Sequence, residues 1–242
     1  GIALAGVVAL VAATRGASPA DAWIALGAIA GGVALVAWRT FARAGGGATA
    51  ATPAGRGSFT PATWGLVACY GVFGFGYILP ATFLPAAARE LVADPSVFGW
   101  TWPVFGVAAA VSTVVASLAL PRAEPRAVWG ASHAVMAFGV ALPFVAPGLP
   151  ALVASALCVG GTFMVATMAG LQEARRLHGV AAPRLMAAMT TAFALGQILG
   201  PVAVRFMPAQ ADPMRAPSLA AAALLALTGA ALVLSSRRAS AT

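Results

Sequence analysis

Apolar runs of roughly 17 to 23 residues follow one another almost to the end of the sequence, and each is about long enough to cross a bilayer as a helix. Charged residues make up only 8% of the 242 residues, against about 25% in ordinary soluble domains. A chain with so little charge cannot cover the surface of a soluble domain. The sequence therefore predicts an all-helical (all-α) membrane protein.

Seven complete apolar spans follow a shorter run at the start of the chain. The opening run covers residues 1–13, fewer than the roughly 20 residues that a span needs. The complete spans lie near residues 22–38, 63–84, 98–120, 127–146, 149–170, 185–206 and 216–234. The longest polar stretch, residues 39–61, has the glycine-rich composition of a flexible linker and separates two helices from six.

The start of the sequence admits two interpretations. We expect residues upstream of Gly1, because the chain lacks an initiator Met and opens on an incomplete span. A secretory signal is the alternative, but the run has no positively charged leading region and a second span follows at once. We therefore interpret residues 1–13 as the end of a transmembrane helix.

The arginines indicate the orientation of the helices. They are scattered singly or in pairs between the spans, which is typical of membrane topology and not of nucleic-acid binding. Ten fall in one set of alternate loops, namely Arg39, Arg43, Arg56, Arg122, Arg126, Arg175, Arg176, Arg184, Arg237 and Arg238. Only four fall in the other set, namely Arg15, Arg89, Arg205 and Arg215. We expect the larger set to be cytoplasmic.

A glycine-rich aromatic segment resembles a known family. Residues 70–85 read YGVFGFGYILPATFLP, and Ala88-Arg89-Glu90 and the sequence FGWTWP at 98–103 follow. Together with six spans after a long linker, this pattern resembles the YbfB/YjiJ-type branch of the major facilitator superfamily. The resemblance covers residues 61–238 well and residues 1–38 less distinctly.

The resemblance implies a twelve-helix transporter built from two six-helix halves. Residues 1–38 would be the end of the N-terminal bundle, residues 39–61 a cytoplasmic linker and residues 62–238 the complete C-terminal six-helix bundle. The first four helices would then be missing, and they are the expected partner of this part of the chain. The branch also implies a multi-pass protein of the bacterial inner membrane.

The helix expected at residues 63–84 has the strongest signs of a binding site. Tyr70 and Tyr77 are seven residues apart and share one face with Phe73. Four residues loosen this helix where it approaches mid-membrane: Gly71, Gly74, Gly76 and Pro80. Interrupted helices near the midplane hold the substrate in many transporters. We therefore interpret the three aromatic residues as substrate contacts, with tight helix packing as the alternative.

Two further spans contribute candidates for the same site. Thr162 and Phe163 lie in the span that the resemblance equates with the tenth helix, which faces the central cavity in the superfamily. Gln197 lies in the penultimate span, and its amide both donates and accepts hydrogen bonds. We interpret these three residues as contacts to a polar or aromatic solute. A hydrogen bond to a neighbouring helix is the alternative for Gln197.

The penultimate span also contains a glycine motif. Residues 196–201 read GQILGP, similar to the Gly-x-x-x-Gly-Pro element of the superfamily's fifth and eleventh helices. Gly196 and Gly200 lie one turn apart and let a neighbouring backbone approach closely, while Pro201 removes a helical hydrogen bond. We expect close packing here, with a moving hinge as the alternative.

Other polar and aromatic residues have simpler interpretations. We expect His133 to be a packed, neutral histidine, with a proton carrier as the alternative. Glu173, beside Arg175 and Arg176 at a cytoplasmic helix end, is expected to form a solvated ion pair that adds little stability, with a gate salt bridge as the alternative. Three tryptophans near span ends are expected to form an aromatic belt at the membrane interface: Trp100, Trp102 and Trp129.

The expected function is secondary transport of a small organic solute by alternating access. None of the six acidic residues lies in the middle of a span, so no coupling carboxylate is expected in this part of the chain. No Walker loop, zinc motif or acidic cluster indicates an enzyme, a cofactor or a metal. A non-transporting membrane subunit, a scaffold or sensor that binds a protein partner, is the alternative.

The arginine distribution predicts that the linker and the loop at Pro147 lie on opposite sides of the membrane. We expect an impermeant thiol reagent on intact cells to label Pro147→Cys and to spare Gly46→Cys, in a background with Cys69→Ala and Cys158→Ala. Both positions should react once the membrane is permeabilised. The reverse labelling pattern on intact cells would show that the orientation is inverted.

Overall fold

The described chain is a bundle of long helices without a strand. A computed structural model describes residues 1–43, 59–91, 94, 99–119, 122–207 and 212–240. Six stretches of these residues are long and apolar enough to cross a membrane, and one of them, Leu149–Arg205, contains two helices. The all-helical membrane class expected from the sequence is confirmed.

Most of the helices are longer than the apolar spans that predicted them. They are α1 (Ile2–Thr14), α2 (Pro19–Arg43), α3 (Pro61–Leu91), α5 (Thr101–Ala119), α6 (Pro125–Val145), α7 (Leu149–His178), η1 (Gly179–Ala181), α8 (Ala182–Arg205) and α9 (Arg215–Ser240). Hydropathy falls where a helix leaves the hydrocarbon core, but a helix satisfies its own backbone hydrogen bonds and continues beyond that point. For example, α3 passes its expected end at Leu84, and α2 continues into the expected linker, of which residues 44–58 lie outside the described residues.

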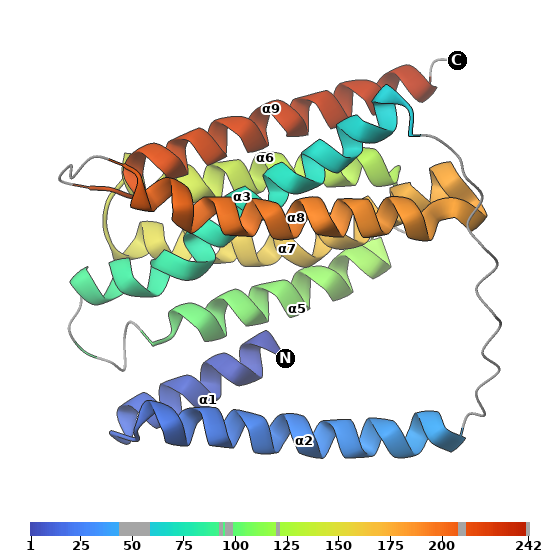
Figure 1. The fold of residues 1–242 in the computed structure, drawn as a ribbon. Coiled ribbons are helices and arrows are strands. Elements are labelled where there is room, and N and C mark those ends of the chain that lie inside the picture. The colour runs from blue at the N-terminus through green and yellow to red at the C-terminus, as the bar shows by residue number, and fades with distance from the viewer. Residues whose placement is uncertain (44–58, 92–93, 95–98, 120–121, 208–211, 241–242) are drawn as a thin grey trace.

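Six of the helices pack into one bundle, and two lie at its edge (Figure 1). In the bundle, α3 packs on α8, α6 lies between α7 and α9, and α5 packs on α7. At the edge, α1 packs on α5, and α2 packs on α1 with no residue of its span buried. The core of the protein is therefore formed by the helices from α3 onward.

Successive helices run in opposite directions, so that their ends alternate between two sides (Figure 1). Polar contacts join several ends on one side, including Arg126 at the start of α6 with Glu173 near the end of α7. Thr63 at the start of α3 lies 3.5 Å from His178 at the end of α7. The described helix ends that carry or adjoin the larger arginine set share this side, and Arg56 of that set lies outside the described residues.

Glycines bring the backbones of α3 and α8 into close contact. A Cβ atom added at Gly71 would lie 3.3 Å from the carbonyl oxygen of Ala192, and one added at Gly74 would collide with the backbone of Phe193. From the other side, a Cβ at Gly196 would lie 2.7 Å from the backbone nitrogen of Phe75. No larger side chain fits at these positions unless the two helices separate.

The same device recurs at the other main helix contacts. Each of these contacts includes a glycine that faces the backbone of the neighbouring helix: Gly130 and Gly229 between α6 and α9, Gly160 and Phe105 between α7 and α5, and Gly6 and Pro103 between α1 and α5. Lipid tails are as apolar as the helix surfaces, so helices associate in a membrane largely through such close packing. Small residues therefore determine which helices pair.

Gly196 and Gly161 form a matched pair that tests this packing. Gly196→Ala should lower the free energy of unfolding by about 1 to 3 kcal/mol, because the new methyl group enters a space that backbone atoms occupy. Gly161→Ala should be neutral or stabilising by up to about 1 kcal/mol, because nothing lies within 4 Å of its added Cβ and alanine favours helix. Unfolding of both variants in detergent measures the difference. Equal stability of the two would contradict the close contact.

Candidate functional site

Five aromatic rings from three helices meet in the middle of the bundle, and we call them the aromatic cluster. Tyr70, Phe73 and Tyr77 come from α3, Phe163 from α7 and Phe193 from α8. Tyr77 stacks on Phe163 with ring centroids 4.2 Å apart and planes at 19°, and Phe73 lies 5.0 Å from Phe193. Phe73 is fully buried, whereas Phe163 and Phe193 are half-buried. The cluster thus has a buried side and a partly accessible side.

The structure brings four of the residues singled out from the sequence into one cluster: Tyr70, Phe73, Tyr77 and Phe163. Phe193 is a member that the sequence interpretation missed. Its position four residues before Gln197 places both on one side of α8, which is the signal that the sequence contained. The backbone of Phe193 lies against Gly74, so the α3–α8 contact itself places this ring in the cluster.

The polar candidates differ in whether their side chains already have a hydrogen-bond partner. The hydroxyl of Thr162 is buried and donates to the carbonyl of Cys158 in its own helix at 2.7 Å. The hydroxyl of Tyr70 interacts with the side chain of Thr167. Gln197 is half-buried, and its amide has no hydrogen-bond partner in the described part of the chain. Its amide is therefore open to a further partner.

The remaining glycine and proline candidates lie at helix contacts or inside helices. Gly76 faces α9 and Gly200 faces α3, each against an aliphatic side chain. Pro80 is buried inside α3, and Pro201 is exposed inside α8. Each proline removes one backbone donor from its helix, which permits a bend at that point.

Trp129 is a core residue, so its expected place in an interfacial belt is wrong. It is fully buried, and its indole N–H donates to Nε2 of His133 at 2.8 Å. Since Nε2 accepts, the proton of the neutral ring is on Nδ1, which donates to the hydroxyl of Thr228 at 2.9 Å. The ring of Trp129 also makes an edge contact with Tyr70. This chain of contacts connects α9 and α6 to the aromatic cluster.

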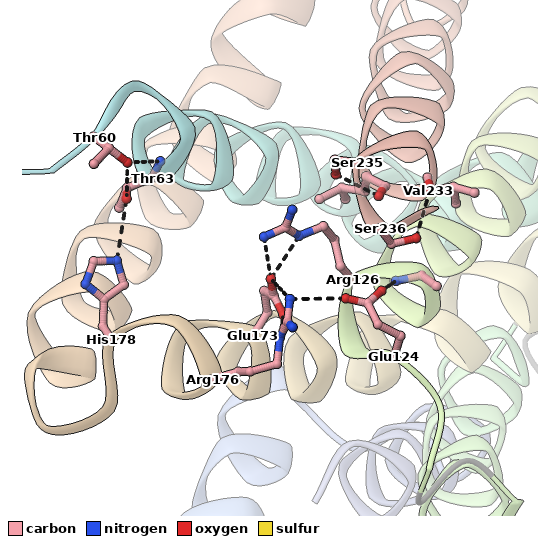
Figure 2. A network of polar contacts seen from close by, with 12 residues as sticks. Thr60, Thr63, Glu124, Arg126, Glu173, Arg176, His178, Val233, Ser235 and Ser236 are labelled. Atoms are coloured by element: carbon pink, nitrogen blue, oxygen red, sulfur yellow. Dashed lines mark hydrogen bonds and ion pairs between the residues drawn. The ribbon is translucent and has the colours of Figure 1, made fainter. Parts of the chain in front are cut away.

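Glu173 is also buried, contrary to the solvated pair expected from the sequence. Its side chain is 1% exposed, and Arg126 of α6 binds Oε1 at 2.6 Å while Arg176 binds Oε2 at 2.8 Å (Figure 2). Arg176 also reaches Glu124, which caps α6 by accepting from the N–H of Ala127 at 2.8 Å. The sequence interpretation did not identify Arg126 as a partner of Glu173, because the two residues are distant along the chain. We call these two acids and two arginines the ion-pair cluster.

A second group of contacts joins the start of α3 to the end of α7 on the same side of the bundle (Figure 2). The hydroxyls of Thr60 and Thr63 lie 2.9 Å apart, and Thr63 lies 3.5 Å from Nε2 of His178. Phe59 packs edge-on against His178 and under the guanidinium of Arg184. Three helix ends are therefore held together where the chain leaves α7 and enters α8.

Long apolar helices, glycine-mediated contacts and an aromatic cluster in mid-helix define a multi-pass membrane protein of the transporter class. The chain belongs to the family described as uncharacterised MFS-type transporter YbfB, which it matches over residues 1–234. The resemblance seen in the sequence is thereby confirmed, and the match includes residues 1–38. This is a transporter family and not an enzyme family. No curated protein and no solved structure matches the chain.

The burial of Glu173 predicts that loss of its charge lowers the stability of the protein more than loss of the Glu124 charge does. Glu173→Gln should lower the free energy of unfolding by about 3 kcal/mol, because it leaves two arginines around a neutral buried group. Glu124→Gln should cost less than about 1 kcal/mol, because that carboxylate is partly solvated and glutamine keeps an acceptor for the helix cap. Thermal unfolding in detergent measures both. A Glu173→Gln variant as stable as Glu124→Gln would contradict the assignment of a buried ion pair.

Proposed function

We propose that this protein is a secondary transporter that moves a small organic solute across the bacterial inner membrane by alternating access. Its membership of a family of MFS-type transporters supports transport as the activity. The aromatic cluster is the observation that supports the position of the solute site. Tyr77, Phe163 and Phe193 each lie near the middle of a membrane-length helix, where a solute is farthest from water on both sides.

The chemistry of the cluster favours an uncharged or aromatic solute. Phe163 and Phe193 keep part of their surface accessible beside the stacked ring of Tyr77. The Tyr77 hydroxyl and the Gln197 amide have no hydrogen-bond partner among the described residues, so both are available to a polar group of the solute. The described acidic residues lie at or beyond helix ends, so this part of the chain offers no coupling carboxylate at the depth of the rings.

Alternating access requires two bundles that move as units and helices that can bend. In the proposed layout α1 and α2 belong to the N-terminal bundle, and α3 to α9 form the C-terminal one. The contact between Gly6 of α1 and Pro103 of α5 would then join the two bundles. Pro80, three residues after Tyr77 in α3, and Pro201, eight residues after Phe193 in α8, supply points of bending in the two helices. The buried ion-pair cluster keeps α6 and α7 together while the bundle moves.

Two conservative substitutions test the solute site. Tyr77→Phe removes only a hydroxyl and Gln197→Leu only an amide, so each should weaken solute affinity by about 1 to 3 kcal/mol. Gln172→Leu, at an exposed position near the end of α7, should leave affinity unchanged. Binding is measured in proteoliposomes with a solute found by thermal-shift screening, and surface expression is checked in parallel. Unchanged affinity in both test variants at normal expression would place the site elsewhere.

A further inference from the structure

A cavity of about 430 Å³ opens at the end of the bundle opposite the ion-pair cluster. It lies among the C-terminal halves of α3 and α6 and the N-terminal ends of α7 and α9. Its walls are largely apolar and include Phe83, Phe144 and Leu152. Two carboxylates, Glu90 and Asp212, also line it, and none of the described lining residues is basic. None of the five rings of the aromatic cluster contributes to the lining, so this cavity is separate from the proposed solute site.

A buried hydroxyl without a partner lies deep in this cavity. Ser155 is fully buried and lines the cavity, and its Oγ has no hydrogen-bond partner in the described part of the chain. Other buried hydroxyls, those of Ser132 and Thr162, donate to carbonyls of their own helices at 2.9 and 2.7 Å. Ser155 lies seven residues after Gly148, which at 1.5 Å per residue is about 10 Å below the start of α7. An unpaired buried hydroxyl is unfavourable, so this position calls for a polar partner.

Two prolines add backbone acceptors next to the cavity. Pro80 and Pro143 line it, and both lie inside helices, where they have no N–H to donate. The carbonyls of Gly76 and Gly139, four residues earlier, therefore lack their usual helical donors. Gly139 packs beside Ser155, since a Cβ atom added to it would lie 3.4 Å from the Ser155 carbonyl oxygen. The carbonyls of Gly76 and Gly139 are free backbone acceptors one turn from the prolines that line the cavity, although neither glycine is itself a lining residue.

The carboxylates at the mouth of the cavity also favour a positively charged hydrogen-bond donor as the ligand. Glu90 and Asp212 are exposed and form no ion pair with a described residue, although Asp212 accepts from the backbone N–H of Met214 at 3.0 Å. The N-terminal ends of α7 and α9 contribute positive potential here and the C-terminal ends of α3 and α6 contribute negative potential, so the helix dipoles largely offset one another. Among the described residues that line the cavity, Glu90 and Asp212 are the charged side chains, whereas Arg89 and Arg215 lie at the same helix ends without lining it. The mouth is therefore favourable to a cation.

We propose that this cavity binds an organic ammonium compound with an apolar body and a hydroxyl at its far end. The ammonium group lies at the mouth between Glu90 and Asp212, and the apolar body packs against the aromatic and aliphatic walls. The hydroxyl reaches Ser155 and forms a hydrogen bond with its orphaned Oγ. An anion finds no basic side chain among the described lining residues, a metal ion does not match the apolar walls, and an acyl chain would leave Ser155 unpaired.

Three related compounds test the proposal on the unmodified protein in lipid nanodiscs. Tyramine has both an ammonium group and a phenolic hydroxyl, phenethylamine lacks the hydroxyl, and 4-ethylphenol lacks the ammonium group. Calorimetric titration should show saturable 1:1 binding of tyramine, with about tenfold weaker binding of each of the other two. Added NaCl should weaken tyramine binding, because the carboxylates are exposed. Absence of saturable tyramine binding, or equal affinity for all three compounds, would overturn the proposal.

Substitutions then assign the binding to this cavity. Ser155→Ala should reduce tyramine affinity about tenfold, to that of phenethylamine, and leave phenethylamine binding unchanged. Glu90→Gln and Asp212→Asn should each weaken both amines about threefold without affecting 4-ethylphenol. Ser117→Ala and Asp21→Asn, at exposed positions away from the cavity, are the matched controls and should bind tyramine normally. Tyr77→Phe should also bind it normally, which separates this cavity from the proposed solute site. Unchanged tyramine affinity in all three test variants would exclude the cavity.

Discussion

The close approach of helix backbones at glycines is the constraint on which the rest of this structure depends. In water, apolar helices would be driven together by burial, but in lipid that force is largely absent and van der Waals packing must replace it. The contact between Gly74 and Phe193 and that between Gly196 and Phe75 bring the α3 and α8 backbones together. Gly130 and Gly229 do the same for α6 and α9. Helix pairing is therefore determined by the positions of residues that have no side chain.

The aromatic cluster is a consequence of this packing. Where α3 and α8 meet at their glycines, the aromatic rings about one turn from these glycines pack beside the contact. Phe193 is held over Phe73 in this way, and α7 adds Phe163 to stack on Tyr77. The arrangement concentrates aromatic surface in the middle of three helices and leaves part of it accessible. A single set of close contacts thus produces both the stability of the bundle and its candidate site.

Polar groups are distributed so that each part of the bundle has a different chemistry. Buried hydroxyls such as that of Thr162 donate to carbonyls of their own helices, and His133 is satisfied between Trp129 and Thr228. The ion pairs of Glu173 lie at one end, where they join α6 to α7. The opposite end has a cavity with acids at its mouth and Ser155 without a partner. Among the described residues, Ser155 Oγ is therefore a buried side-chain atom without a hydrogen-bond partner, and it lies beside this cavity.

The sequence by itself determined the membrane class, the order of the helices and the family, because hydropathy runs and local motifs such as residues 70–85 are properties of neighbouring residues. It also placed Tyr70, Phe73 and Tyr77 on one helix face, since helical periodicity is local. Only the tertiary structure decided that Phe193 joins these rings, that Trp129 is buried and that Glu173 binds Arg126, 47 residues away along the chain. Each of these depends on which helix faces which, and that is determined by the fit of glycines against distant backbones, which no local pattern records.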